Sequence, residues 1–408
     1  MAGFILKITA TLVVLLSAAL YQIQFPRMVS LGFGLGRALE PLSAFPYTCR
    51  RINHERLKAC EDMWLSESTR QLFLACSEPI HGKMRRANID FAGCSVGHLN
   101  VSGMHLDDAI VVLDLDDLNA GAEVKPRVLT TPGFFGTNGE GLLHLVSLTG
   151  VDGEDGSIRL WVINLKPSLN TTTGELLDQP KVGANVTVEL FTTSSKAETL
   201  EYVKTFAHPQ IISPNRIAPV GGDSEAFYFT NDHAAKVGLQ HHLSPLIGTG
   251  DVSFCEGSNC RQVARGFKMP NGLAKGLDGL IYVPSSMLGT IDVFQPQPNG
   301  DLVKVDSIDT GYSLDNLSVD QDGNIFAAAI PDGIKFLAAN LDPYKKNAPA
   351  TALKVTKKSE GGFEVTKVLE DGLTEVLPGT TSVVHDAKTG RVFFSGVFSP
   401  YIAVCDPK

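Results

Sequence analysis

The sequence Asp315-Asn-Leu-Ser-Val-Asp320 leads through an Asp322-Gly turn into Asn324-Ile-Phe-Ala-Ala328, and this unit decides the fold. It consists of a polar opening, an alternating apolar stretch, a turn of Gly/Asp type and a β-rich run. The same order of features occurs six times, on average about 64 residues apart, in copies that open at Glu61, His144, Asn215, Asn271, Asp315 and Thr381. A repeating antiparallel unit cannot bury its apolar face alone, so the copies must pack together. Six copies predict an all-β protein, a closed six-bladed β-propeller.

The composition is that of one large folded domain. The chain has 408 residues, of which 43% are hydrophobic, and no long Pro/Gly/Ser linker interrupts it. We therefore expect the propeller over residues 49–408, preceded by a lead segment over residues 28–48. The net charge of −9 and the lack of a basic stripe argue against nucleic acid as a partner. Short capping helices are expected over Asp232–His242 and near Tyr344.

Residues 1–27 have the character of a signal peptide or a signal-anchor. The run Ile8–Ile23 carries no charge and is flanked by Lys7 and Arg27. It is shorter than the ~20 residues needed to span a bilayer, and the small residues 17–19 could form a cleavage zone. The sequence leaves cleavage or retention open. Either outcome predicts the secretory pathway, with an extracellular propeller or one anchored on the lumenal or outer side of a membrane.

Seven cysteines agree with an oxidising compartment. None has the C-x-x-C spacing of a zinc site, so disulfides are expected. Cys255 and Cys260 flank a turn and could close a small loop. Cys49 and Cys405 lie outside the first and last repeats, where a propeller needs a clasp. The sequence leaves open the pairing of Cys60, Cys76 and Cys94. Candidate glycan sites occur at Asn100, Asn170 and Asn185, whereas the sequon at Asn316 is expected to be buried.

Carboxylate or amide side chains open four of the six copies. The innermost strand of each blade runs along the central tunnel, so residues at the starts of these strands should face one another. The resulting ring has two carboxylates and three amide carbonyls, from Glu61, Asn215, Asn271, Asp315 and Asn316. These hard oxygen ligands suit Ca²⁺, and the two carboxylates balance one divalent ion. For any single copy, a simple turn-forming role of Asn or Asp remains the alternative.

His144 opens the second copy and should face the same axis. It could act as a general base or position a water molecule; the alternative is a core histidine bonded to a backbone carbonyl. Calcium in a tunnel mouth can polarise a carbonyl or phosphoryl oxygen, which favours hydrolysis of esters or lactones. No Gly-x-Ser-x-Gly elbow supplies a serine nucleophile. We expect His233 to be a supporting or packing residue and both His241 and His242 to be exposed.

At these residues the chain resembles the serum paraoxonase/arylesterase family, within the gluconolactonase-like six-bladed propellers. The matching stretches are Glu61-Asp62, Phe227-Tyr-Phe-Thr-Asn-Asp-His233, Gly266-Phe-Lys-Met-Pro-Asn-Gly272, Asp315-Asn-Leu-Ser-Val-Asp320 and Pro331-Asp-Gly-Ile-Lys335. The resemblance implies hydrolysis of small-molecule lactones, aryl esters and sometimes organophosphates, and membrane association through a retained N-terminal apolar segment. It also implies a ring-closing Cys49–Cys405 disulfide and a catalytic calcium held by Glu61, Asn215, Asn271, Asp315 and Asn316.

Two positions depart from the family pattern. The resemblance implies a second histidine near the end of the strand that follows His144, and this chain has Leu165 there. It also implies an Asp after the Asn of the third copy, where a second, structural calcium is held, and this chain has Arg216. We therefore expect one calcium ion, with the Arg216 guanidinium in the second ion's place and paired with Asp62. The alternative is an Arg216 that swings out to solvent.

The leading hypothesis is a calcium-dependent hydrolase of lactones or aryl esters, in which water attacks a carbonyl at the tunnel mouth. Two other functions stay open. One is a non-catalytic, calcium-stabilised propeller that binds a protein or glycan, which the missing second histidine favours. The other is an enzyme similar to strictosidine synthase, which joins its substrates instead of cleaving them.

Overall fold

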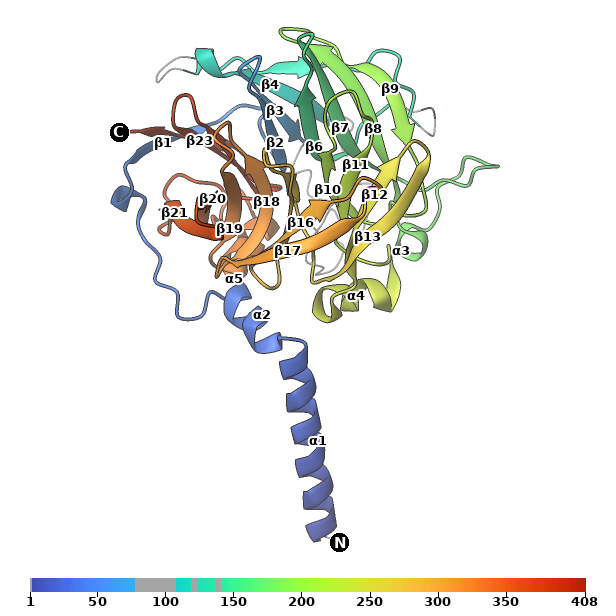
Figure 1. Cartoon of the computed structure of the whole chain (residues 1–408), viewed down its shortest axis with the longest axis vertical. Helices are drawn as coiled ribbons and strands as arrows, with labels where there is room; N and C mark the ends of the chain where they lie inside the picture. The colour runs from blue at the N-terminus through green and yellow to red at the C-terminus, as the bar shows by residue number, and fades with distance from the viewer. Residues whose placement is uncertain (1, 78–107, 119–122, 137–138, 140) are drawn as a thin grey trace.

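The computed structural model arranges the strands as six four-stranded antiparallel sheets around a central axis (Figure 1). It describes residues 2–77, 108–118, 123–136, 139 and 141–408. This is the six-bladed β-propeller predicted from the repeats. Within each of the first five blades the strands follow in chain order from the axis outward, so the first strand of each repeat lines the tunnel.

The first three blades take up the N-terminal half of the ring. Blade one contains β2 (Asp62–Ser66), β3 (Gln71–Cys76), β4 (Ala109–Asp114) and β5 (Arg127–Leu129). Blade two contains β6 (Leu145–Asp152), β7 (Ser157–Lys166), β8 (Asn185–Ser194) and β9 (Glu201–Phe206). Blade three contains β10 (Pro214–Pro219), β11 (Phe227–Asn231), β12 (Gly250–Glu256) and β13 (Asn259–Phe267).

The other three blades complete the ring. Blade four contains β14 (Ala274–Lys275), β15 (Ile281–Ser285), β16 (Thr290–Pro296) and β17 (Leu302–Asp309). Blade five contains β18 (Ser313–Val319), β19 (Ile325–Ile330), β20 (Ala350–Lys357) and β21 (Phe363–Asp371). Blade six combines β22 (Ser382–Asp386), β23 (Arg391–Ser395) and β24 (Ile402–Pro407) with β1 (Tyr47–Ile52).

The two ends of the chain close the ring in blade six. Strand β1 pairs with β24, and Cys49 lies directly opposite Cys405. A disulfide joins these two residues, as expected, across a sequence separation of 356. A cross-link that closes so long a loop restricts the unfolded chain and typically contributes roughly 2–4 kcal/mol. Two further disulfides, Cys60–Cys76 and Cys255–Cys260, each staple neighbouring segments. Cys94 and Asn100 lie outside the described residues.

The hydrophobic core lies between neighbouring blades. One cluster joins Phe73 and Val112 of blade one to Leu160 and Phe191 of blade two. Because each sheet is covered on both faces by its neighbours, its central strands lack an exposed side. This explains why β19 reads Ile-Phe-Ala-Ala-Ala-Ile, a continuous apolar run, where a strand with one solvated face would alternate.

Helices gather at one side of the disc (Figure 1). They are α1 (Ala2–Gln22), α2 (Phe25–Gly32), α3 (Gln179–Val182), α4 (Gly238–Ile247) and α5 (Gly333–Leu341), with short 3-10 turns at Leu42–Ala44 and Leu115–Asp117. The helix expected over 232–242 instead begins at Gly238, because Val237 before it is extended, with φ −147° and ψ 169°. The helix expected near Tyr344 lies earlier, as α5, where Asp332 caps it by accepting from Lys335 N at 3.0 Å.

The lead segment contacts the propeller, while α1 extends away from it (Figure 1). Arg27 donates to Leu288 O at 2.7 Å and pairs with Asp309 at 2.6 Å. Met28 and Leu31 are buried. Within the described residues, no helix has by itself the length and apolar character to cross a membrane. Residues 11–22 and 25–32, bent by 62° at their break, meet both conditions together.

Candidate metal centre

The inner strands bring the predicted oxygen ligands to one end of the tunnel. Glu61 directly precedes β2, and its carbonyl accepts from Thr381 Oγ1 at 3.0 Å and from Asn316 Nδ2 at 3.5 Å. The backbone of Asn316 donates to Thr381 O at 3.0 Å, and Leu317 N donates to Gly272 O at 2.9 Å. The openings of the first, fourth, fifth and sixth copies therefore adjoin one another.

β-Bulges set the direction of several of these side chains. The ladder register shifts between Pro214 and Ile217 in β10 and between Leu314 and Leu317 in β18. A regular strand would point successive side chains to opposite faces, whereas a bulge re-aims them. The pairs 215–216 and 315–316 occupy the two bulges. Both side chains of each pair can therefore point toward the tunnel axis. In a regular strand only one of two successive side chains would do so.

Two of the amide ligands present unpaired oxygens. Asn215 Oδ1 and Asn316 Oδ1 are buried without a hydrogen-bond partner. Asn316 is only 2% exposed, as expected for this sequon, and its Nδ2 donates to Ser382 Oγ at 3.1 Å. A Cβ at Gly272 would lie 1.9 Å from Asn316 Oδ1, so only glycine leaves room for this carbonyl. Because a buried acceptor without a partner is costly, these two oxygens are suited to hold a cation.

Carboxylates converge on the same place. Burial raises the pKa of Glu61 well above its ordinary value, helped by the negative charges of Asp315, Asp62 and Asp232 and opposed by Arg216. Burial, followed by the charge of Asp62, raises the pKa of Asp315 to about 8. Four mutually repelling carboxylates therefore share one buried region, which requires positive charge to keep them ionised.

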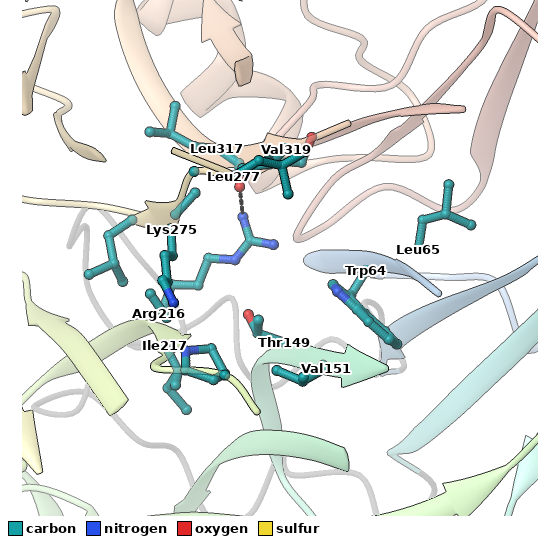
Figure 2. A pocket seen from close by; sticks show the side chains of 18 of the residues that line it. Trp64, Leu65, Thr149, Val151, Arg216, Ile217, Lys275, Leu277, Leu317 and Val319 are labelled. Atoms are coloured by element: carbon teal, nitrogen blue, oxygen red, sulfur yellow. Dashed lines mark hydrogen bonds between the residues drawn. The ribbon is translucent and has the colours of Figure 1, made fainter. Parts of the chain in front are cut away.

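Arg216 supplies part of that charge, and its side chain extends across the tunnel toward Leu317 (Figure 2). Its NH2 lies 3.0 Å from Asp62 Oδ1, with both side chains almost fully buried. NH1 donates to Leu317 O, and NH2 lies 3.3 Å from Met63 O. The structure thus contains the ion pair that the sequence led us to expect. It does not show the exposed Arg216 of the alternative.

Asp62 extends this contact to further blades. Its Oδ2 accepts from Ser147 Oγ at 2.5 Å and its Oδ1 from Ser382 Oγ at 3.1 Å. Its own neighbour Met63 donates a backbone N–H at 2.8 Å. Together with the Arg216 contacts, this one ion pair connects the inner strands of blades one, two, three, five and six.

Two of the four carboxylates lie beside a nitrogen-bearing side chain. Asp62 is paired with the guanidinium, and Asp232 Oδ1 lies 2.7 Å from His233 Nδ1. Burial alone would lower the pKa of His233, but the charge and hydrogen bond of Asp232 outweigh it and raise that pKa. Glu61 and Asp315 have no cationic partner in the part of the chain that the structure describes. Two uncompensated carboxylates match one divalent ion.

The donor set is mixed in type. The described residues contain no cluster of three or more His, Cys, Asp and Glu side chains that could hold a metal. Three of the five expected ligands are amides, and only Glu61 and Asp315 are carboxylates. Hard amide and carboxylate oxygens in a partly formed cage fit calcium, and the unpaired Asn215 and Asn316 oxygens are the structural sign of that fit.

His144 directly precedes β6 and is 8% exposed. Its N–H donates to Asn164 Oδ1 at 2.8 Å, and its carbonyl accepts from Leu165 N at 2.8 Å. Leu165 therefore lies beside it on β7, and no imidazole is available there. Burial, with a smaller contribution from the charge of Lys166, lowers the pKa of His144 to about 4. The neutral form of His144 is thus favoured at pH 7, and burial makes the ring a weaker base than an ordinary histidine.

Sequence reasoning missed Asp232 and misplaced His241. Asp232 acts on both ring carboxylates through its charge, and its signal was the Asn-Asp-His motif that ends β11. His241 was expected to be exposed, but it is only 4% exposed. It stacks on His233 with ring centroids 4.1 Å apart and bonds to Ala235 O at 2.9 Å. His242, on the outer face of α4, is exposed as expected.

Fold and site together define a six-bladed propeller with a carboxylate and amide ring at one end of its tunnel. The sequence model of the family described as Arylesterase matches residues 173–398, more than half of the chain. The chain therefore belongs to the arylesterase family.

Individual relatives agree with this assignment. Human serum paraoxonase/arylesterase 1 is 28% identical over 229 residues, which cover 53% of this chain and 61% of the relative. Serum paraoxonase/lactonase 3 of Oryctolagus cuniculus is 33% identical over 217 residues, covering 52% and 59%. The chain thus spans about 60% of the length of the curated relatives it matches.

Solved structures with a similar chain path include a gluconolactonase from Xanthomonas campestris and a regucalcin from Agrobacterium tumefaciens. The gluconolactonase is 14% identical with a TM-score of 0.43, and 91% of this chain and 99% of that chain are covered. The regucalcin is 10% identical with a TM-score of 0.44, and the coverage is 88% and 94%.

Proposed function

We propose that this chain is a calcium-dependent hydrolase of lactones or aryl esters. The observation that carries the proposal is the site itself. Two buried amide oxygens without partners, from Asn215 and Asn316, lie in a region where the carboxylates of Glu61 and Asp315 have no cationic partner in the described part of the chain. Membership of the arylesterase family and the paraoxonase, arylesterase and lactonase names of the relatives support the reaction class.

One calcium ion is expected, held by Glu61, Asn215, Asn271, Asp315 and Asn316. When bound, calcium would polarise the substrate carbonyl and stabilise the charge that develops on its oxygen. The amide of Asn271 is oriented in advance, because its Oδ1 accepts from Gly272 N at 2.8 Å and its Nδ2 lies 3.3 Å from Ser286 Oγ. A second ion is not expected, because Asp62 already has its cation in Arg216.

Proton transfer from the attacking water would fall to His144. Its neutral form predominates at pH 7 because burial keeps its pKa low. Since Leu165 lies beside it, His144 would act without a second imidazole to relay the proton. The alternative base is His233, whose ring is oriented by the 2.7 Å contact with Asp232.

We also propose that the protein acts outside the cytosol. Three disulfides within the described residues fit an oxidising compartment. The apolar residues 11–22 and 25–32 could associate with a membrane. Because α1 projects from the side of the disc where the other helices lie, that side would then face the lipid (Figure 1).

Hydrolysis of phenyl acetate and δ-valerolactone, followed with and without a chelator, tests the proposal. We expect turnover with calcium, loss of turnover after chelation, and recovery when calcium is added back in excess. Magnesium should restore little, because it prefers near-ideal octahedral geometry and holds its waters tightly. Undiminished turnover after complete calcium removal would contradict the proposal.

A second candidate is a calcium-stabilised binding module without catalysis. The observation that favours it is Leu165 beside His144, which removes a histidine pair from the site. It predicts that calcium raises the melting temperature while neither substrate is hydrolysed. Measuring stability and turnover on the same sample separates the two functions.

A further inference from the structure

A cavity of about 360 Å³ lies in the tunnel, with Arg216 in its wall (Figure 2). All six inner strands contribute to its walls, through Trp64, Thr149, Ala218, Lys275, Val319 and Val384 among others. The ring residues lie at the starts of these strands, and most of the cavity residues lie later in them. The volume is within the ~300–1,000 Å³ of small-molecule sites. Neither the proposed calcium nor the proposed hydrolysis uses this space.

The charged side chains that line the cavity are both cationic. They are Arg216 and Lys275, and no Asp or Glu is among its lining residues. Arg216 is 4% exposed, and its Nε is buried without a hydrogen-bond partner. Lys275 Nζ makes one hydrogen bond within the described residues, to Val220 O. An ammonium group has three N–H donors, so two of them remain to be used.

A third polar group completes the set. Thr149 Oγ1 is buried without a partner and lines the same cavity (Figure 2). Arg216 Nε, Lys275 Nζ and Thr149 Oγ1 can all donate a hydrogen bond, so an acceptor group bound in the cavity would pair with them. The other labelled lining side chains, including Trp64, Val151 and Val319, are apolar or aromatic. The ligand must therefore combine an acceptor group with an apolar body.

The charge balance sets the charge of that ligand. The guanidinium of Arg216 is already neutralised by Asp62 at 3.0 Å, which leaves Lys275 as the uncompensated cation. Burial lowers the pKa of Lys275, as expected for an ammonium group without a nearby carboxylate. One extra positive charge matches a monoanion better than a dianion such as a phosphate monoester, and it repels metal ions.

We propose that this cavity binds a small carboxylate anion with an apolar body, such as an aromatic or short aliphatic acid. The carboxylate oxygens accept from Lys275, Arg216 Nε and Thr149, and the apolar body lies against Trp64. This site is separate from the proposed calcium centre, because the Arg216–Asp62 pair lies between them.

The probe for this site is sodium benzoate, compared with benzamide, which has nearly the same shape without the charge. Calorimetric titration of the full chain should give one benzoate site, with benzamide at least about tenfold weaker. The titration is repeated in the presence of a chelator, because a carboxylate could also ligate calcium. Benzoate binding that persists after calcium is removed supports the cavity site. Benzoate binding that is lost when calcium is removed overturns it. Equal affinity for benzamide also overturns it.

Variants then locate the site. Lys275→Met should weaken benzoate binding about 10- to 100-fold, whereas Lys275→Arg should retain most of the affinity. The matched control is Lys236→Met, which removes another partly buried lysine bonded to a single backbone carbonyl, Ala184 O at 2.8 Å. Unchanged binding by a folded Lys275→Met variant would contradict the assignment. If that variant does not fold, the comparison of benzoate with benzamide on the unmodified chain still decides.

Discussion

The two ends of the tunnel are made by the same six strands, yet their chemistry is opposite. At the strand starts, amide and carboxylate oxygens gather, and Glu61 and Asp315 have no cationic partner among the described residues. The cavity lining is mainly apolar, with the two cations Arg216 and Lys275 and no acid. Arg216 and Asp62 form the boundary, and each follows directly after a ring residue in the sequence. A step of one residue along an inner strand therefore leads from the proposed cation site to the proposed anion site.

Removing the boundary should have the largest effect. Arg216→Met leaves Asp62 buried without its cation, and loss of one partner of a buried pair typically costs about 3–5 kcal/mol. Urea unfolding in saturating calcium measures the change. The double variant Asp62→Asn/Arg216→Met should recover part of the stability, because no charge is then left unpaired. Equal stability of the Arg216→Met variant and the parent would show that the pair does not hold the inner strands together.

Changing the acidic end comes next. Asp315→Asn keeps the shape of the side chain but removes one of the two uncompensated carboxylates. Calcium affinity should fall about 10²- to 10³-fold, as for loss of a buried charge partner. Titration with a calcium buffer measures this. The control is Asp322→Asn, the same chemical change at an exposed position six residues after Asn316. This variant should bind calcium like the parent.

A catalytic role of His144 predicts a smaller, purely kinetic effect. His144→Gln should lower kcat about 10²-fold or more while calcium affinity stays unchanged. Because burial holds the pKa of His144 at about 4, the parent should keep its activity between pH 8 and 6. An enzyme whose base had an ordinary histidine pKa would lose about three quarters of its activity at pH 6. His242→Gln, at an exposed position, is the control, and a parent profile that falls near pH 6.5 would assign the base elsewhere.

The smallest effect is expected at the far mouth, where Glu67 follows β2. Burial, followed by the charge of Asp386, raises its pKa from 4.5 to about 7. The folded state therefore binds more protons than the unfolded state between these values, and stability falls as the pH rises through this window. The Glu67→Gln variant should not lose stability in this way. At pH 8 its free energy of unfolding should exceed that of the parent by an amount on the order of 1 kcal/mol, after allowance for the partial exposure of Glu67. Urea unfolding at pH 5 and 8, with Glu55→Gln as an exposed control, checks the prediction.

The sequence allowed the fold, the ring closure and the Arg216–Asp62 contact to be predicted, because a repeat places equivalent residues at equivalent points around an axis. The repeat carried no signal for Asp232, which lies after β11 and reaches the centre from a loop. The bulges in β10 and β18 break the period of two and cannot be read from residue type. The burial of His241 depends on how α4 packs. The cavity could not be foreseen, because its polar groups are scattered over several blades.

Counting bound calcium tests the central claim most directly. Equilibrium dialysis of the metal-free chain against labelled calcium should give one tight site per chain, lost in Asp315→Asn. Zero tight sites would mean that the oxygen ring serves another purpose. Two would mean that the Arg216 guanidinium does not stand in for a second ion.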